Sequence, residues 1–352
     1  MLNRADDRLG GVPPTYYLWP PGDINMRVPD PIRKCVGFIA VREASGLKHL
    51  GTGFVVSIQG SYGNHSAFLV TAGHIAEQIE SREWLLRLNT TSGVTVELVA
   101  RPNSSKWYYH PRERQYVDAA ATLFGPTQTE GMKADFRPIP SEMFVTEETF
   151  EEKGIGVGDE VFITGLFSKV IETTRVLPII RMGNVAMIPG EKIPNGKKLI
   201  EAYLIESRST GGLSGSPVFV RETVRLQQTV PKPGIKLNEV SDSIPGQSLQ
   251  VIEMLGVGRY YLFGCAIGHW DLPVGSALDT ERVNMGIALV TPARKILDIL
   301  QQPELTEMMK KGDEYVKALR DSETKITEDS AMTPAFTQDQ LNEALKKAEG
   351  ET

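Results

Sequence analysis

The sequence has few cysteines, no long apolar run and no excess of basic residues, and each absence argues against a class of protein. Two cysteines in 352 residues are too few for a secreted domain held together by disulfides. No apolar run reaches the roughly 20 residues of a transmembrane helix, so no membrane partner is expected. The formal net charge of −6 argues against a nucleic-acid-binding protein, because such proteins usually carry a basic face.

The amino-terminal segment also lacks the features of a secretory signal. It contains acidic residues early and has no apolar core of the required length. Together with the two cysteines, Cys35 and Cys265, this predicts a cytoplasmic protein. The composition is 41% hydrophobic and 23% charged, which is enough to bury a full core in one or two globular units.

The hydrophobic residues occur in short runs that are typical of β-strands. "CVGFIAVREA", "GTGFVVSIQ" and "SAFLVTAGH" are rich in β-branched and aromatic residues and are separated by turn-forming residues. Similar runs return after a stretch without a sustained period. The expected fold class is therefore all-β, with two strand-rich halves joined by a connection.

Changes in this pattern predict the division of the chain. The predicted parts are an irregular N-terminal extension (1–34), a first strand-rich half (35–135), a connection (136–157), a second strand-rich half (158–302) and a charged, partly helical C-terminal tail (303–352). The second half contains a polar insertion at about 221–250. The spacing of apolar residues within 291–301 predicts a helix at the end of this half.

Two positions in the first half are candidates for acid–base chemistry. His74 stands where an apolar strand ends and a helical pattern begins, and an imidazole with a pKa of about 6.5 suits a general base. Asp118 heads the apolar run "VDAAATLF" and needs a partner, because an unpaired buried carboxylate is costly. A histidine satisfied by local hydrogen bonds and a solvated carboxylate at a strand end remain the alternatives.

Glycine and hydroxyl residues surround Ser214 in "STGGLSGSPVFV". Glycine permits tight turns, which would let the N–H groups of Gly212 and Ser214 point into one cavity and stabilise an oxyanion. A glycine-rich hairpin is the alternative. The pattern is not the nucleophile elbow of α/β-hydrolases, because Ser216 occupies the last position of G-x-S-x-G.

In chain order, these motifs resemble those of the chymotrypsin-like (trypsin-fold) serine peptidases. "TAGH", "VDAAATLF" and "GLSGSPVF" are similar to that family's His, Asp and Ser motifs, and "GTGFVV" resembles the strand before the His motif in bacterial members. The resemblance covers roughly residues 36 to 300. It implies two six-stranded antiparallel β-barrels, one in each half, with a C-terminal helix and terminal extensions.

The resemblance implies a serine endopeptidase that needs no metal and no cofactor. His74 would take the proton of Ser214, and Asp118 would orient the imidazole. The N–H groups of Gly212 and Ser214 would bind the oxyanion. Leu213 stands where the family's digestive members have an aspartate, so activation through an ion pair with a new N-terminus is not expected.

Substrate preference is predicted from a closer similarity to bacterial glutamyl endopeptidases. By that similarity Arg208, Ser209 and His269 would bind an acidic side chain before the scissile bond of a protein or peptide substrate. The other histidines, His49, His65 and His110, lack metal-ligand spacing and are expected at the surface.

Two further functions stay open. One alternative is a catalytically silent pseudoprotease that binds peptides. The other is a scaffold that uses the peptidase fold as a platform and recruits a partner through its tail. A regulatory partner for the C-terminal tail is a hypothesis that rests on the tail's charged composition.

Overall fold

The computed structural model describes residues 28–62, 65–125, 134–167, 175–196, 198–207, 212–223, 225–229, 251–255, 259–273 and 282–332. Most of the N-terminal extension, residues 230–250 of the predicted insertion and the tail beyond Met332 lie outside this range. The elements in chain order are α1 (Asp30–Lys34), β1 (Val36–Glu43), β2 (Gly46–Gln59), β3 (His65–Thr71), α2 (Gly73–Ile79), β4 (Trp84–Asn89), β5 (Thr95–Ala100), β6 (Tyr108–Tyr109), β7 (Ala120–Leu123), β8 (Ile139–Pro140), η2 (Ser141–Met143), α4 (Glu147–Lys153), β9 (Glu160–Gly165), β10 (Ile179–Met187), β11 (Ile193–Asn195), β12 (Lys198–Ile200), β13 (Tyr203–Glu206), β14 (Pro217–Arg221), β15 (Arg225–Thr229), β16 (Val251–Leu255), β17 (Tyr260–Pro273), β18 (Arg282–Pro292), α5 (Ala293–Leu300) and α6 (Pro303–Met332).

The first sheet brings the His74 and Asp118 segments together. It has eight strands in the order β5-β4-β1-β2-β3-β7-β6, with β8 paired in parallel to β2, and is thus larger than the expected six strands. β3 and β7 pair in antiparallel fashion, with Thr71 opposite Ala120. This register places the residues after β3 beside the residues before β7, which is where His74 and Asp118 stand.

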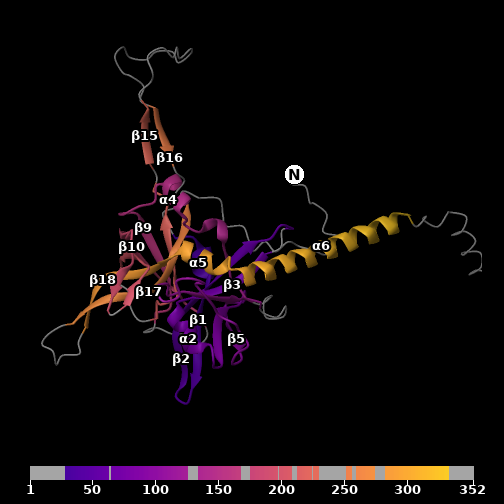
Figure 1. The fold of residues 1–352 in the computed structure, drawn as a ribbon, viewed down its shortest axis with the longest axis horizontal. Helices are drawn as coiled ribbons and strands as arrows, with labels where there is room; N and C mark the ends of the chain where they lie inside the picture. The colour runs from indigo at the N-terminus through magenta and orange to yellow at the C-terminus, as the bar shows by residue number, and fades with distance from the viewer. Residues whose placement is uncertain are drawn as a thin grey trace, which may run out of the picture. The chain divides into compact units, whose positions relative to one another are not determined.

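The second sheet closes into a barrel of six antiparallel strands, in the order β10-β13-β18-β17-β14-β9. Figure 1 labels β9, β10, β17 and β18 of this barrel. β14, which follows Ser214, is inserted between β9 and β17. The all-β fold with a closed antiparallel barrel, a further strand-rich sheet and a helix after the barrel is confirmed.

Buried apolar side chains fill both sheets. Val161, Val218, Phe263 and Val290 belong to the core of the barrel. The core of the first sheet includes side chains from the barrel strands as well, among them Leu289. Side chains from both halves of the chain therefore pack together in one core cluster.

The helix predicted near residue 291 is α5. Three of its apolar side chains, Ile296, Ile299 and Leu300, are fully buried, as the spacing predicts. The helix follows β18 directly, with Pro292 at its start. β15 lies within the predicted insertion and pairs in antiparallel fashion with β16, which follows the insertion.

α6 belongs to a separate unit with the segment around residues 59–65. Within this unit the N–H of Ser61 donates to Asp313 Oδ2 at 2.9 Å, and Lys317 lies 5.9 Å from the centre of the Tyr62 ring. In the part of the chain that is described, no helix has both the length and the apolar character needed to cross a bilayer.

Cys35 and Cys265 are both buried and both carry free thiols. Burial raises the pKa of each thiol, because a thiolate is poorly solvated in the interior. The two residues are therefore unreactive core side chains in this structure.

Candidate active site

His74 lies in the first turn of α2 and binds one carboxylate through two of its atoms. Its backbone N–H donates to Asp118 Oδ1 at 2.8 Å, and its ring Nδ1 lies 2.8 Å from Asp118 Oδ2. An ionised carboxylate can only accept hydrogen bonds, so Nδ1 carries the proton and Nε2 keeps its lone pair. This is the tautomer that a general base of this kind needs.

The backbone around this pair leaves room for the carboxylate. A Cβ added to Gly73 would lie 3.0 Å from Asp118 Oδ1, so the glycine of "TAGH" allows the close approach. Thr291, at the end of β18, donates its hydroxyl to the Asp118 carbonyl at 3.3 Å. Asp118 is thus held by groups from both halves of the chain.

The pKa of His74 is raised above its ordinary value. Burial by itself lowers the pKa of the imidazole, but the hydrogen bond and the charge of Asp118, together with the charge of Glu77, outweigh this effect. The side chain remains 41% exposed. The site therefore stabilises the imidazolium that forms when the ring takes up a proton.

Ser214 lies in a tight loop before β14. Gly212 and Gly215 on either side of it have φ of +99° and +82°, a region that glycine adopts without strain. The Ser214 hydroxyl donates to the carbonyl of Ile267 at a long 3.5 Å. Within the described residues it makes no hydrogen bond to His74, so the expected contact between nucleophile and base is not formed in this conformation.

The loop of Ser214 and the helix of His74 nevertheless meet at one residue of β2. A Cβ added to Gly51 would lie 2.4 Å from Ile75 Cδ1 and 2.7 Å from the Ser214 carbonyl oxygen. Ile75 directly follows His74 in α2. The first glycine of "GTGFVV" therefore lets the loop of Ser214 and the helix of His74 pack against the same point of the sheet.

The N–H groups of Gly212 and Ser214 make no hydrogen bond within the described part of the chain. The N–H of Ser216 donates to the Leu213 carbonyl at 3.0 Å. Because C=O and N–H point in opposite directions across a trans peptide, this bond turns the Ser214 N–H away from Ser216. The peptide before Gly212 includes residue 211, which lies outside the described range.

Of the predicted substrate-pocket residues, only His269 is described. It is half-buried in β17, opposite Ala288 of β18. Ile267, whose carbonyl accepts the Ser214 hydroxyl, lies two residues earlier in the same strand. Arg208 and Ser209 lie outside the described residues.

A cavity of about 500 Å³ adjoins the His74–Asp118 pair. Its walls come from α2, the loop before Asp118 and the hairpin of β11 and β12. Arg114 in this wall lies 3.4 Å from Glu77 and stacks 3.9 Å above the Tyr109 ring. Lys198, which also lines the cavity, is exposed and has no ion pair among the described residues.

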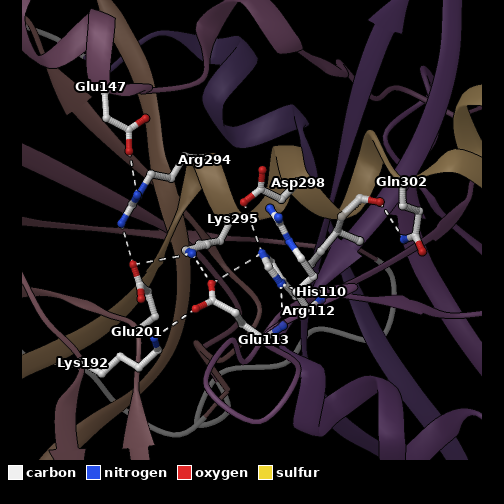
Figure 2. A network of polar contacts seen from close by, with 11 residues as sticks. His110, Arg112, Glu113, Glu147, Lys192, Glu201, Arg294, Lys295, Asp298 and Gln302 are labelled. Carbon is white, nitrogen blue, oxygen red and sulfur yellow. Dashed lines mark hydrogen bonds and ion pairs between the residues drawn. The ribbon is translucent and has the colours of Figure 1, made fainter.

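Figure 2 shows the charged network that holds the loop before Asp118. Glu113 in this loop forms ion pairs with Lys295 of α5 and with Lys192, the latter at 3.0 Å. The hydrogen bond from Lys295, followed by that from Lys192, lowers the pKa of Glu113 to about 2. The carboxylate therefore stays ionised over the whole physiological range.

His110 anchors the start of the same loop. Its Nδ1 accepts the N–H of Glu113 at 3.0 Å, and its Nε2 lies 3.2 Å from Asp298 Oδ2 (Figure 2). The side chain is only 1% exposed, so the expectation that His110 lies at the surface is wrong. No pattern in the sequence indicated that His110 is buried, because its partner Asp298 is 188 residues away.

The network extends to the barrel and to α4. Arg294 binds Glu147 at 2.6 Å and Glu201 at 2.5 Å (Figure 2). The N–H of Glu201 in turn donates to the carbonyl of Tyr116 at 2.8 Å. The loop that precedes Asp118 is thus attached to α5 and to the segment between β12 and β13.

Comparisons with known proteins found similarity to solved structures. No protein-family model matches the sequence, and no curated protein matches it. Among solved structures, the MamO protease domain from Magnetospirillum magneticum in its apo form is similar, with 15% identity, 78% of this chain and 99% of that chain covered, and a TM-score of 0.43. The Rv3671c protease in its inactive form has 13% identity, with 76% and 88% covered and a TM-score of 0.38. At these values the similarity says nothing about activity.

Proposed function

We propose that the protein is a serine endopeptidase. The observation that carries this proposal is the pair of hydrogen bonds between Asp118 and His74, one to the backbone N–H and one to ring Nδ1, which leaves Nε2 to accept a proton. A partly exposed histidine without a catalytic role would not need its backbone N–H and its ring held by the same carboxylate. The glycine geometry around Ser214 supports the same reading.

In the proposed reaction, Ser214 Oγ attacks the scissile carbonyl while His74 Nε2 takes the hydroxyl proton. Asp118 stabilises the resulting imidazolium, and the N–H groups of Gly212 and Ser214 bind the oxyanion. The imidazolium then gives its proton to the leaving amine, and an acyl-enzyme remains. Water, activated by the same histidine, releases the acid product and restores the serine.

The reaction requires the Ser214 side chain to turn from the Ile267 carbonyl toward His74. The present hydrogen bond is long, at 3.5 Å, so little is lost when it breaks. Such contacts are often loose in an unoccupied site and tighten with substrate.

For specificity we propose an acidic side chain before the scissile bond, recognised by His269 with Arg208 and Ser209. The position of His269 supports this proposal. His269 lies in β17, two residues after Ile267, whose carbonyl accepts the Ser214 hydroxyl. A peptide library that compares Glu, Asp, Gln, Arg and Phe at this position tests it. Efficient cleavage after Arg, with none after Glu, would overturn the acidic preference and leave the peptidase intact.

One observation favours a second function, a pseudoprotease that binds peptides without cutting them. The Ser214 hydroxyl is bound to a carbonyl rather than to the base. A fluorophosphonate probe separates the two functions, because it labels only an activated serine. We expect labelling of the wild type and none of Ser214→Ala, with peptide hydrolysis lost in the same variant. A folded wild-type protein that binds peptides but neither labels nor hydrolyses would establish the pseudoprotease.

A further inference from the structure

Thr52 is a fully buried residue of β2 that bonds to the loop of Ser214 through two of its atoms. Its backbone N–H donates to the Ser214 carbonyl at 2.9 Å. Its hydroxyl donates to the Gly212 carbonyl at 3.1 Å. One residue of the first sheet thus holds the Ser214 carbonyl through its backbone N–H and the Gly212 carbonyl through its hydroxyl, and these are the two residues whose N–H groups would bind the oxyanion.

The remaining polar groups of Thr52 are also occupied. Its Oγ1 accepts the N–H of Leu166 at 2.9 Å, just after β9. Its carbonyl accepts the hydroxyl of Thr71 at 2.8 Å, and Thr71 ends the strand that leads to His74. Thr52 therefore connects the strand of the base, the loop of the nucleophile and the barrel strand beside that loop.

The packing around these bonds leaves little room for another arrangement. A Cβ added to Gly215 would lie 2.0 Å from the Thr52 carbonyl oxygen and 2.4 Å from Thr71 Oγ1. A Cβ added to Gly165 would lie 2.8 Å from Thr52 Oγ1. These glycines allow the loop and β9 to approach Thr52 closely, so the contact depends on small residues on both sides.

We propose that Thr52 is a positioning residue for catalysis, which sets the orientation of the Gly212–Leu213 peptide through its hydroxyl and so shapes the oxyanion site. The inference rests on the proposed peptidase function. Gly212, with φ of +99° and no Cβ, has several accessible conformations, and the Thr52 hydroxyl selects one of them. Thr52 touches neither the substrate nor the reacting atoms and acts through this loop.

The test compares Thr52→Val, which has the same shape without the hydroxyl, with Thr52→Ser, which keeps it. Thr164→Val is the matched control, because Thr164 is a fully buried threonine of β9 whose hydroxyl has no partner among the described residues. The measurement is the rate of labelling by a fluorophosphonate, together with kcat and KM for a cleaved peptide. Circular dichroism and thermal unfolding establish that each variant is folded.

We expect Thr52→Val to label about 10- to 100-fold more slowly, with kcat lowered and KM nearly unchanged, because misplaced oxyanion donors act on the transition state. Thr52→Ser should recover most of the rate, and Thr164→Val should equal the wild type. A folded Thr52→Val protein that labels at the wild-type rate, or one whose KM alone changes, overturns the inference while the peptidase function stands.

The remaining outcomes also test the peptidase function and the role of Thr52. If the folded wild type labels no faster than Ser214→Ala, the peptidase function fails and the catalytic role of Thr52 fails with it. If Thr52→Val does not fold, Thr52→Cys replaces it, since a thiol of similar size is only a weak donor. Its rate should then lie well below that of Thr52→Ser, and equal rates would overturn the inference.

Discussion

Asp118 binds His74 through both carboxylate oxygens, one to the backbone N–H and one to ring Nδ1, each at 2.8 Å. The first bond places the helix that carries the ring, and the second orients the ring itself. Orientation of the imidazole is therefore not left to side-chain packing alone, since the same carboxylate holds the backbone and the ring of His74.

Replacing this carboxylate by an amide should nearly abolish turnover. Asp118→Asn keeps the size of the side chain but permits the wrong imidazole tautomer, and we expect kcat to fall about 10³- to 10⁴-fold. Peptide hydrolysis under saturating substrate measures it. Asp135→Asn is the control, because Asp135 pairs with Lys34 at 2.8 Å outside the candidate site. A loss of less than tenfold in Asp118→Asn would contradict the assigned role.

The pH dependence of kcat/KM should report the raised pKa of His74. The base must be neutral to act, so activity rises with pH through the pKa of the ring, above the usual value of about 6.5. In Glu77→Gln one of the groups that raise this pKa loses its charge, so the acidic limb should move to lower pH. A limb that does not move, or that moves to higher pH, would contradict this electrostatic account.

Breaking the Glu113 ion pairs should destabilise the fold. In Glu113→Gln the largely buried Lys295 loses a charged partner, and we expect the free energy of unfolding to fall by about 2 kcal/mol at neutral pH. Urea denaturation measures it. Glu307→Gln, in an exposed pair with Lys311 at 4.0 Å, should change stability by less than about 0.5 kcal/mol.

The same pair makes a prediction with a definite sign in acid. The folded-state pKa of Glu113 is lowered, so its stabilising contribution is present above about 4.5 and is lost as the pH falls toward about 2. The difference in unfolding free energy between wild type and Glu113→Gln should therefore shrink in acid. A difference that grows as the pH falls would show that the pKa is not lowered.

Gly215→Ala should lower the stability of the fold by more than a positive φ alone explains. Gly215 has φ of +82°, and its added Cβ would lie 2.0 Å from the Thr52 carbonyl oxygen. Gly158→Ala is the matched control, because Gly158 has φ of +98° but open space around the added Cβ. We expect the control to lose about 1–3 kcal/mol from strain and Gly215→Ala to lose more, as measured by thermal unfolding. Equal losses would mean that the loop moves away without cost.

The cavity beside His74 should influence which residues are accepted further from the scissile bond. Lys198 in its wall has no ion pair among the described residues, so Lys198→Glu should lower kcat/KM for peptides with an acidic side chain there by about two- to fivefold. Matched peptides with Gln in place of Glu should change less, and Lys198→Gln should give an intermediate value. An equal change for both peptides would exclude a charge effect.

Local sequence patterns were enough to predict many of the strands and α5, and to single out the catalytic candidates. Alternation of apolar and turn residues predicts strands, because it reflects which side chains face the core within a few residues. The motifs around His74, Asp118 and Ser214 combine particular residue types with glycines that the backbone needs for close approach. Such requirements are local, and they can be seen in one segment at a time.

The contacts between distant segments were decided only by the tertiary structure. Thr52 contacts Gly212 across 160 positions, and Glu113 contacts Lys295 across 182, and neither partner has a local pattern that indicates the other. Their meeting depends on strand register and on the closure of the barrel. The sequence by itself determined which residues are chemically able to act, whereas the packing of the two sheets decided which groups hold them and in which direction, because those bonds exist only after distant strands are paired.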